Sequence, residues 1–123
     1  SEMIKLQQYT FVCAPSFAQY AVSRSLGTDL SKHITSYKKK RDLMYDGLKD
    51  KYQIIKPGGA FYLFPQAPWG DDEEFVTSAI KKNLLIIPGS VFSERHTHFR
   101  ISYAATEETI KRGIEILNDL ARR

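Results

Sequence analysis

The sequence of 123 residues contains a single cysteine, Cys13, and no long hydrophobic run. One cysteine cannot form an internal disulfide, and because it has no CxxC partner it does not indicate a metal site. Its apolar neighbours favour a small hydrophobic side chain, with a reactive thiol as the alternative. No apolar stretch approaches the roughly 20 residues of a membrane-spanning helix, and no charged-then-apolar signal opens the chain. We therefore expect a soluble, most simply cytoplasmic protein without a membrane partner.

A strong charge of one sign is also absent. The chain has 18 Lys and Arg against 14 Asp and Glu, a formal net charge of +4. The excess is local, because seven basic and three acidic residues lie between Lys32 and Lys51. Such a segment is typical of a solvent-exposed helix face, and a nucleic-acid or membrane footprint is the alternative. Hydrophobic residues make up 42% of the chain, enough for one domain with a core of its own.

Helix signals occur at several places in the sequence. A capping-box pattern predicts a helix from Ser16 to about Gly27. A second helix should begin around Asp29 to Ser31, and one of its faces consists of Ile34, Tyr37, Arg41, Met44 and Leu48. The arginine in that stripe has to snorkel or pair with an acid. The acidic run 71–74 suits the start of a third helix, and Thr106 caps a fourth.

Short apolar segments predict strands at residues 53–56, 60–64, 84–87 and 99–103. The Pro-Gly-Gly sequence at 57–59 predicts a tight turn or hairpin between the first two. Because residues 60–64 are apolar throughout, we expect a strand covered on both faces. The fold class is α+β: a small, mainly antiparallel or mixed sheet of about four short strands, with helices packed chiefly on one face.

Arg100 is the strongest candidate for a functional residue. Period-two alternation places Phe99, Ile101 and Tyr103 on one face of their strand, and Arg100 with Ser102 on the other. A guanidinium in such an apolar strand is costly unless an anion meets it, and its planar fork suits a carboxylate. A structural salt bridge and an exposed edge position are the alternatives.

Other motifs are weaker. His96 and His98 resemble a pair of metal ligands, but no third ligand of suitable type lies nearby, so we expect loop histidines and no metal. Ser90 follows a Pro-Gly turn, and turn chemistry explains it better than anion binding. No nucleophile–base set and no glycine-rich phosphate loop occurs. Gly58–Phe64 overlaps the aromatic strand of RNA-recognition domains, but Gly59 stands where an aromatic ring should stack and the helix-first order differs.

Three stretches of the sequence, taken together, indicate one class of protein. They are residues 8–19, residues 57–65, and residues 85–92 followed by 99–104 and an amphipathic terminal helix. In order and spacing they resemble the C-terminal small domain of the fold-type I, pyridoxal-phosphate-dependent aminotransferases, the aspartate aminotransferase group. By this resemblance residues 1–15 are the segment that leads from a cofactor domain, and residues 16–123 are the small domain.

The resemblance implies roles for individual residues. Arg100 matches the family arginine that binds the α-carboxylate of the substrate. Phe61 falls where the family places residues near the substrate, with core packing as the alternative. Residues 88–92 would shape the loop that precedes the arginine strand. The implied reaction, in a homodimeric parent protein, transfers an amino group between an amino acid and a 2-oxo acid.

The resemblance also implies what this chain lacks. The family holds pyridoxal 5'-phosphate as a Schiff base on a lysine, beside an aspartate on the pyridine nitrogen. In the family these residues belong to the large domain, and no lysine in this sequence has the family context. We therefore expect a fragment without catalytic or cofactor-binding residues, with no bound cofactor, no nucleic acid and no activity of its own. A freestanding module that binds a ligand through Arg100 is the alternative, and an RNA-binding domain is a more distant one.

Overall fold

The structure is a computed structural model that describes residues 1–122, and the chain divides into two compact units at Ser31 and Lys32. The first unit contains α1 (Glu2–Thr10) and α2 (Ser16–Ser25), and neither helix buries a residue. The predicted helix at Ser16 is confirmed, but its capping box is wrong. Pro15 is the N-cap, and the Gln19 amide donates to the carbonyl of Ala14 at 2.7 Å instead of reaching back to a backbone donor.

Two further differences concern this first unit. Helix α1 was not predicted from the sequence, because its apolar residues are exposed and show no clear periodic stripe. Cys13, in the link between the two helices, is exposed as a free thiol and does not pack as a small hydrophobic side chain. The boundary predicted between residues 15 and 16 concerns a connection to another domain, and it stays a prediction.

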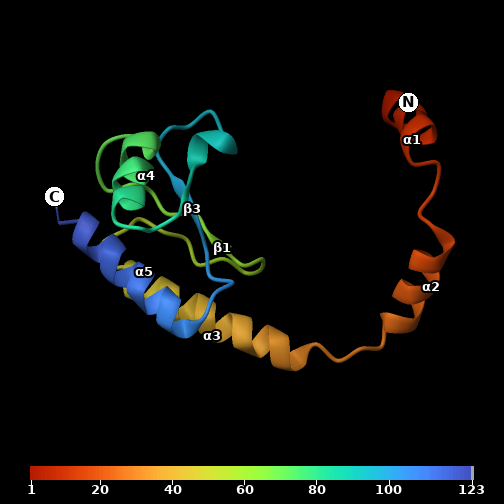
Figure 1. Cartoon of the computed structure of the whole chain (residues 1–123), viewed down its shortest axis with the longest axis horizontal. Helices are drawn as coiled ribbons and strands as arrows, with labels where there is room; N and C mark the ends of the chain where they lie inside the picture. Colours follow the sequence, from red (N-terminus) through yellow and green to blue (C-terminus); the bar gives the residue numbers. More distant parts are fainter. Residues whose placement is uncertain (123) are drawn as a thin grey trace. The chain divides into compact units, whose positions relative to one another are not determined.

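The second unit carries the sheet and its helices (Figure 1). In chain order its elements are α3 (Ser31–Leu48), β1 (Tyr62–Leu63), α4 (Asp72–Lys81), β2 (Ile87–Pro88), the short 3₁₀ helix η1 (Gly89–Val91), β3 (Phe99–Ser102) and α5 (Glu107–Leu120). Two helix starts form as the sequence predicts. The Asp71 carboxylate accepts a hydrogen bond from the backbone N–H of Glu74, and the Thr106 hydroxyl accepts one from Thr109.

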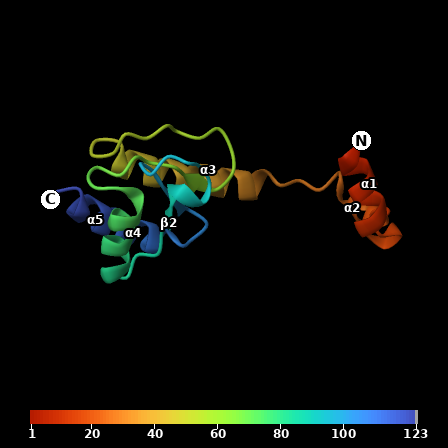
Figure 2. The same ribbon diagram turned by 90° about the horizontal axis from the view of Figure 1, so that it is seen from above.

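The sheet is three-stranded and antiparallel, in the order β1-β3-β2. The α+β class is confirmed, but residues 53–56 form no strand and no hairpin surrounds residues 57–59; Figure 2 draws this region as a loop. The prediction that residues 60–64 are covered on both faces is wrong, since Phe61 and Phe64 are each 41% exposed. The reason is that β1 lies at the sheet edge, where only the alternating residue Leu63 points into the core.

The core lies between the sheet and the helices of the second unit. Its buried side chains include Met44 and Leu48 of α3, Phe75, Val76 and Ala79 of α4, Leu63, Phe99, Ile101 and Tyr103 of the sheet region, and Ile110, Leu117 and Leu120 of α5. The helices therefore cover chiefly one face of the sheet, as predicted, and this face carries Phe99 and Ile101. Arg100 and Ser102 lie on the opposite face.

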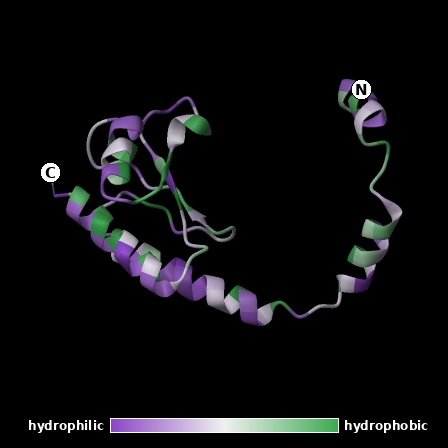
Figure 3. Ribbon diagram, viewed as in Figure 1, coloured by the Kyte–Doolittle hydropathy of each residue, from purple (hydrophilic) through white to green (hydrophobic). Residues whose placement is uncertain are grey.

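Helices α3 and α5 lie side by side (Figures 1 and 2), and the Asn118 amide of α5 donates to the carbonyl of Gly47 in α3 at 3.0 Å. Helix α5 carries both hydrophobic and hydrophilic residues (Figure 3), and Ile110, Leu117 and Leu120 are buried at helical spacing, as expected for the amphipathic terminal helix. The predicted stripe of α3 is only half correct. Ile34 and Tyr37 are 52% and 40% exposed, because the core contacts only the second half of this helix.

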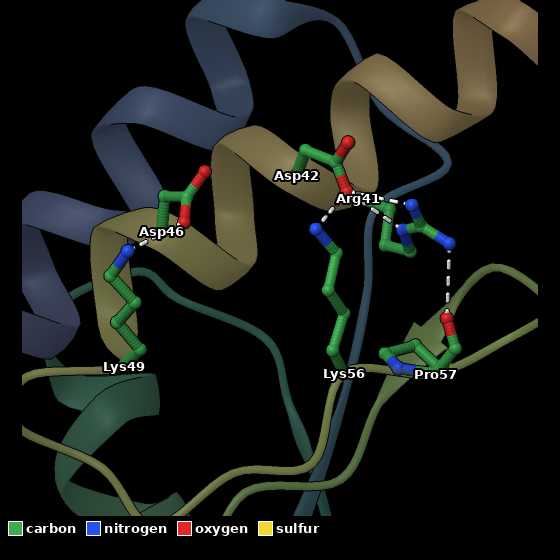
Figure 4. Close-up of polar contacts among 6 residues, drawn as sticks. All are labelled: Arg41, Asp42, Asp46, Lys49, Lys56 and Pro57. Atoms are coloured by element: carbon green, nitrogen blue, oxygen red, sulfur yellow. Dashed lines mark hydrogen bonds and ion pairs between the residues drawn. The ribbon is translucent and has the colours of Figure 1, made fainter.

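Arg41 lies in the predicted stripe of α3 and pairs with an acidic side chain, which is one of the two predicted outcomes (Figure 4). Its guanidinium lies 2.8 Å from the Asp42 carboxylate and donates to the carbonyl of Pro57 at 3.2 Å. Lys56 approaches the same carboxylate oxygen at 2.8 Å. These contacts fasten α3 to the loop that leads into β1, which is the loop that carries Phe61.

Candidate functional site

Arg100 occupies the central strand of the sheet and is half-buried. Its guanidinium carbon lies 4.4 Å from the ring centroid of Tyr62 and 4.3 Å from that of Phe92. The two rings come from opposite sides of β3, since Tyr62 belongs to β1 and Phe92 follows β2 and η1. Cation–π attraction at such distances stabilises the charge while it holds the side chain in one place.

The guanidinium has no anionic partner of its own. Within residues 1–122 no carboxylate lies within salt-bridge distance of Arg100, and its side chain donates no hydrogen bond. Within residues 1–122, Arg100 therefore forms no structural salt bridge, and it lies in the central strand and not at the edge of the sheet. Because aromatic rings leave the in-plane N–H donors unused, the group can still take a carboxylate by two parallel hydrogen bonds.

Aromatic contacts extend the site on both sides of Arg100. Phe61 lies 4.4 Å from Tyr62 between ring centroids, and Tyr37 of α3 lies 6.3 Å from Phe61. On the other side Phe92 contacts Phe64 at 6.5 Å. The structure thus brings the two predicted site residues, Arg100 and Phe61, to one surface through Tyr62. Tyr62 and Phe92 were not predicted to contact Arg100, although both are aromatic and both lie in the stretches that carry the family resemblance.

The backbone around Phe61 is held firmly. Ala60 has a φ of 60°, in the left-handed region that a residue with a Cβ rarely adopts. The Tyr103 hydroxyl donates to the carbonyl of Ala60 at 2.8 Å, and the Tyr103 N–H donates to the carbonyl of Phe61 at 3.0 Å. Burial raises the pKa of the Tyr103 phenol, so it remains a donor at neutral pH. Strain at Ala60 is therefore balanced by contacts that fix Phe61 at the surface.

The turn before β3 is held by a buried carboxylate that sequence reasoning missed. Asp72, in the first turn of α4, is fully buried, and its Oδ2 accepts a hydrogen bond from the backbone N–H of Ser90 at 2.7 Å. His96 Nδ1 lies 3.3 Å from the other carboxylate oxygen. Burial alone raises the pKa of Asp72, but the Ser90 hydrogen bond and the neighbouring His96 outweigh it and hold the pKa below its usual range.

Gly89 is required where this turn passes close to β3. A Cβ on Gly89 would lie 2.5 Å from the carbonyl oxygen of His98, which also accepts the Gly89 N–H at 2.7 Å. We expect Gly89→Ala to lower the free energy of unfolding by about 1–3 kcal/mol, since a rigid backbone has to move. Urea denaturation of the chain measures this.

Gly58→Ala is the matched control, because a Cβ on Gly58 would meet no atom within 4 Å. We expect it to change the free energy of unfolding by no more than about 0.5 kcal/mol. Equal effects of the two substitutions would contradict the close approach at Gly89.

The remaining sequence motifs form no site. His98 stacks on Phe64 at 5.3 Å and His96 faces Asp72, and across residues 1–122 no group of three or more His, Cys, Asp or Glu side chains is placed to hold a metal. In the same part of the chain, no helix is both long and apolar enough to cross a membrane. Every lysine within residues 1–122 is exposed or half-buried.

Comparisons with known proteins agree on one family. The chain matches the family model "Aminotransferase class I and II" over residues 2–117. The probable aspartate aminotransferase of Methanocaldococcus jannaschii is 38% identical over 125 residues, which cover 98% of this chain and 33% of that protein. The aspartate aminotransferase of Sulfolobus acidocaldarius is 34% identical over 138 residues and covers 98% of this chain and 34% of that protein.

A solved structure supports the same conclusion. The crystal structure of aspartate aminotransferase from Thermotoga maritima matches with a TM-score of 0.83 and 29% identity, over 97% of this chain and 32% of that one. The fold and the site define an α+β domain whose central strand holds an arginine between two aromatic rings. With the match over residues 2–117, the chain belongs to the class I and II aminotransferases. It spans about a third of the length of the relatives that it matches.

Proposed function

We propose that residues 16–123 form the C-terminal small domain of a pyridoxal-phosphate-dependent aminotransferase, and that residues 1–15 lead from its cofactor domain. The parent enzyme, a homodimer in this proposal, transfers an amino group between an amino acid and a 2-oxo acid. Two observations support this assignment: relatives are named aspartate aminotransferases, and this chain covers about a third of each.

The Arg100 guanidinium carries the proposal, because it is charged, ring-stacked and without an anionic partner in residues 1–122. In the proposed enzyme its two parallel N–H groups bind the α-carboxylate of the substrate. Tyr62 and Phe92 keep water from the guanidinium next to their rings and fix its orientation. Phe61 borders the same surface and contacts the substrate from the side of β1.

Pyridoxal phosphate supplies the electron sink for the reaction when it is bound. The lysines of residues 1–122 do not fit this group, since none of them is buried and those with acidic partners form exposed pairs such as Lys49 with Asp46. The proposal therefore assigns the Schiff-base lysine and the pyridine aspartate to a large domain outside this chain. The contribution of this chain is to bind and orient the substrate carboxylate.

The isolated chain is expected to be inactive, because it supplies one wall of the active site. Adding pyridoxal phosphate should give no saturable change in visible absorbance, and no amino group should pass between amino acids and 2-oxo acids. A dispersed NMR spectrum checks that the chain is folded. A saturable absorbance change with turnover would contradict the proposal.

Calorimetry distinguishes the freestanding module from the fragment. A module that binds a carboxylate through Arg100 alone should release heat with 2-oxo acids, and Arg100→Met should abolish that heat. The fragment proposal predicts no measurable heat from the chain alone. Joining the chain to a lysine-bearing cofactor domain of the family should restore transamination.

A further inference from the structure

Asp72 is a buried carboxylate with no part in the α-carboxylate site itself. We propose that Asp72 is a positioning residue: it holds the turn Gly89–Val91 and thereby places the ring of Phe92 on the guanidinium of Arg100. The functional consequence rests on the proposed role of Arg100, whereas the placement of the ring does not. Asp72 would act only through Phe92, and it touches neither substrate nor cofactor.

Asp72 contacts both flanks of the segment between η1 and β3. On the side of η1, its Oδ2 accepts the Ser90 N–H at 2.7 Å. On the side of β3, its backbone N–H donates to the carbonyl of His96 at 3.3 Å, and its Oδ1 lies 3.3 Å from His96 Nδ1. One residue of α4 therefore fixes the start and the end of the loop that leads to Arg100.

Phe92 depends on this backbone for its position. Its N–H donates to the carbonyl of Gly89 at 2.8 Å, which makes it the residue that closes η1 two positions after Ser90. The Phe92 ring is 50% exposed, so core packing does not hold it. Its contacts with Arg100 at 4.3 Å and Phe64 at 6.5 Å follow from where the turn puts it.

The capping of α4 does not explain the Asp72 carboxylate. The neighbouring residue Asp71 already caps the helix by accepting the Glu74 N–H at 2.8 Å. A buried charge is costly unless hydrogen bonds and opposite charge offset the loss of water. Here the Ser90 N–H and the positive end of the α4 dipole offset part of this loss, whereas Oδ1, 3.3 Å from His96 Nδ1, has no hydrogen-bond partner within residues 1–122. Apart from the α4 dipole, the group that offsets this cost belongs to the segment before Arg100.

The NMR signals of the Arg100 side chain report the contact directly in the 123-residue chain. Ring currents from Phe92 shift these signals, and Phe92→Leu defines their position without that ring. We expect Asp72→Ala to move them to the Phe92→Leu position. Asp72→Asn should move them part of the way, because a neutral amide accepts the Ser90 hydrogen bond about half as strongly.

Asp71→Ala is the matched control, since it removes a carboxylate one residue away that does not contact the loop. It should leave the Arg100 signals in place. If Asp72→Ala does not fold, Asp72→Asn decides, because it keeps the shape of the buried side chain. Arg100 signals at wild-type positions in a folded Asp72 variant would overturn the proposal.

Kinetics of the chain joined to its cofactor domain separate this inference from the proposed function. Asp72→Asn should raise KM for the amino acid by about three- to tenfold and leave kcat within about twofold, as loss of ground-state binding does. Asp71→Ala should change neither. Moved Arg100 signals with an unchanged KM would contradict the role of Arg100 in binding, while unmoved signals would contradict the role of Asp72.

Discussion

Arg100→Met is expected to lower kcat/KM by about 10²- to 10⁴-fold when the chain is joined to a cofactor domain of the family. The substitution removes two charge-assisted hydrogen bonds to the α-carboxylate, each worth about 1.5–3 kcal/mol. The methionine keeps an apolar side chain between Tyr62 and Phe92, so the rings retain a partner. Steady-state kinetics with an amino acid and a 2-oxo acid measure the loss.

Two further variants sharpen this expectation. Arg100→Lys keeps the charge but not the planar fork, so it should recover only part of the lost activity. Arg112→Met changes an exposed arginine on α5 and should leave kcat/KM unchanged. An Arg100→Met enzyme with wild-type kcat/KM would contradict the binding role of this residue.

Phe99→Ala is expected to lower the free energy of unfolding of the second unit by about 3–5 kcal/mol. Phe99 is fully buried and its ring lies 4.9 Å from Phe75 and 5.9 Å from Tyr52. Truncation leaves a cavity where α4, the sheet and the chain after α3 meet. Urea denaturation of the 123-residue chain, followed by circular dichroism, measures the change.

Phe17→Ala is the control for this substitution, because Phe17 is 77% exposed in the isolated chain. It should change the free energy of unfolding by no more than about 0.5 kcal/mol. A Phe99→Ala chain as stable as wild type would mean that the contacts of Phe99 with Phe75 and Tyr52 do not stabilise this core.

Local signals predicted the parts of the fold that local chemistry determines. The caps Asp71 and Thr106 lie in the sequence beside the backbone donors that they satisfy. The alternation in 99–103 follows from strand geometry alone, and it placed Arg100 opposite Phe99 and Ile101 correctly.

Other features depend on contacts between distant residues, and the sequence did not predict them. Residues 53–56 have an apolar pattern, but they form no strand, and Ile55 is 87% exposed. Asp72 belongs to an acidic run that suits any helix start, and only the arrival of Ser90, 18 residues later, makes it a buried acceptor. The rings beside Arg100 are determined by sheet order in the same way, since Tyr62 belongs to the neighbouring strand β1 and Phe92 follows the neighbouring strand β2 and η1.

The proposed binding of the α-carboxylate by Arg100 is tested by the selectivity of the enzyme for substrates that carry this group. The measurement compares kcat/KM for an amino acid with that for the matching amine, which lacks the α-carboxylate, in wild type and in Arg100→Met. We expect the wild type to prefer the amino acid strongly and Arg100→Met to lose about 100-fold or more of this preference. The same preference in both enzymes would contradict it.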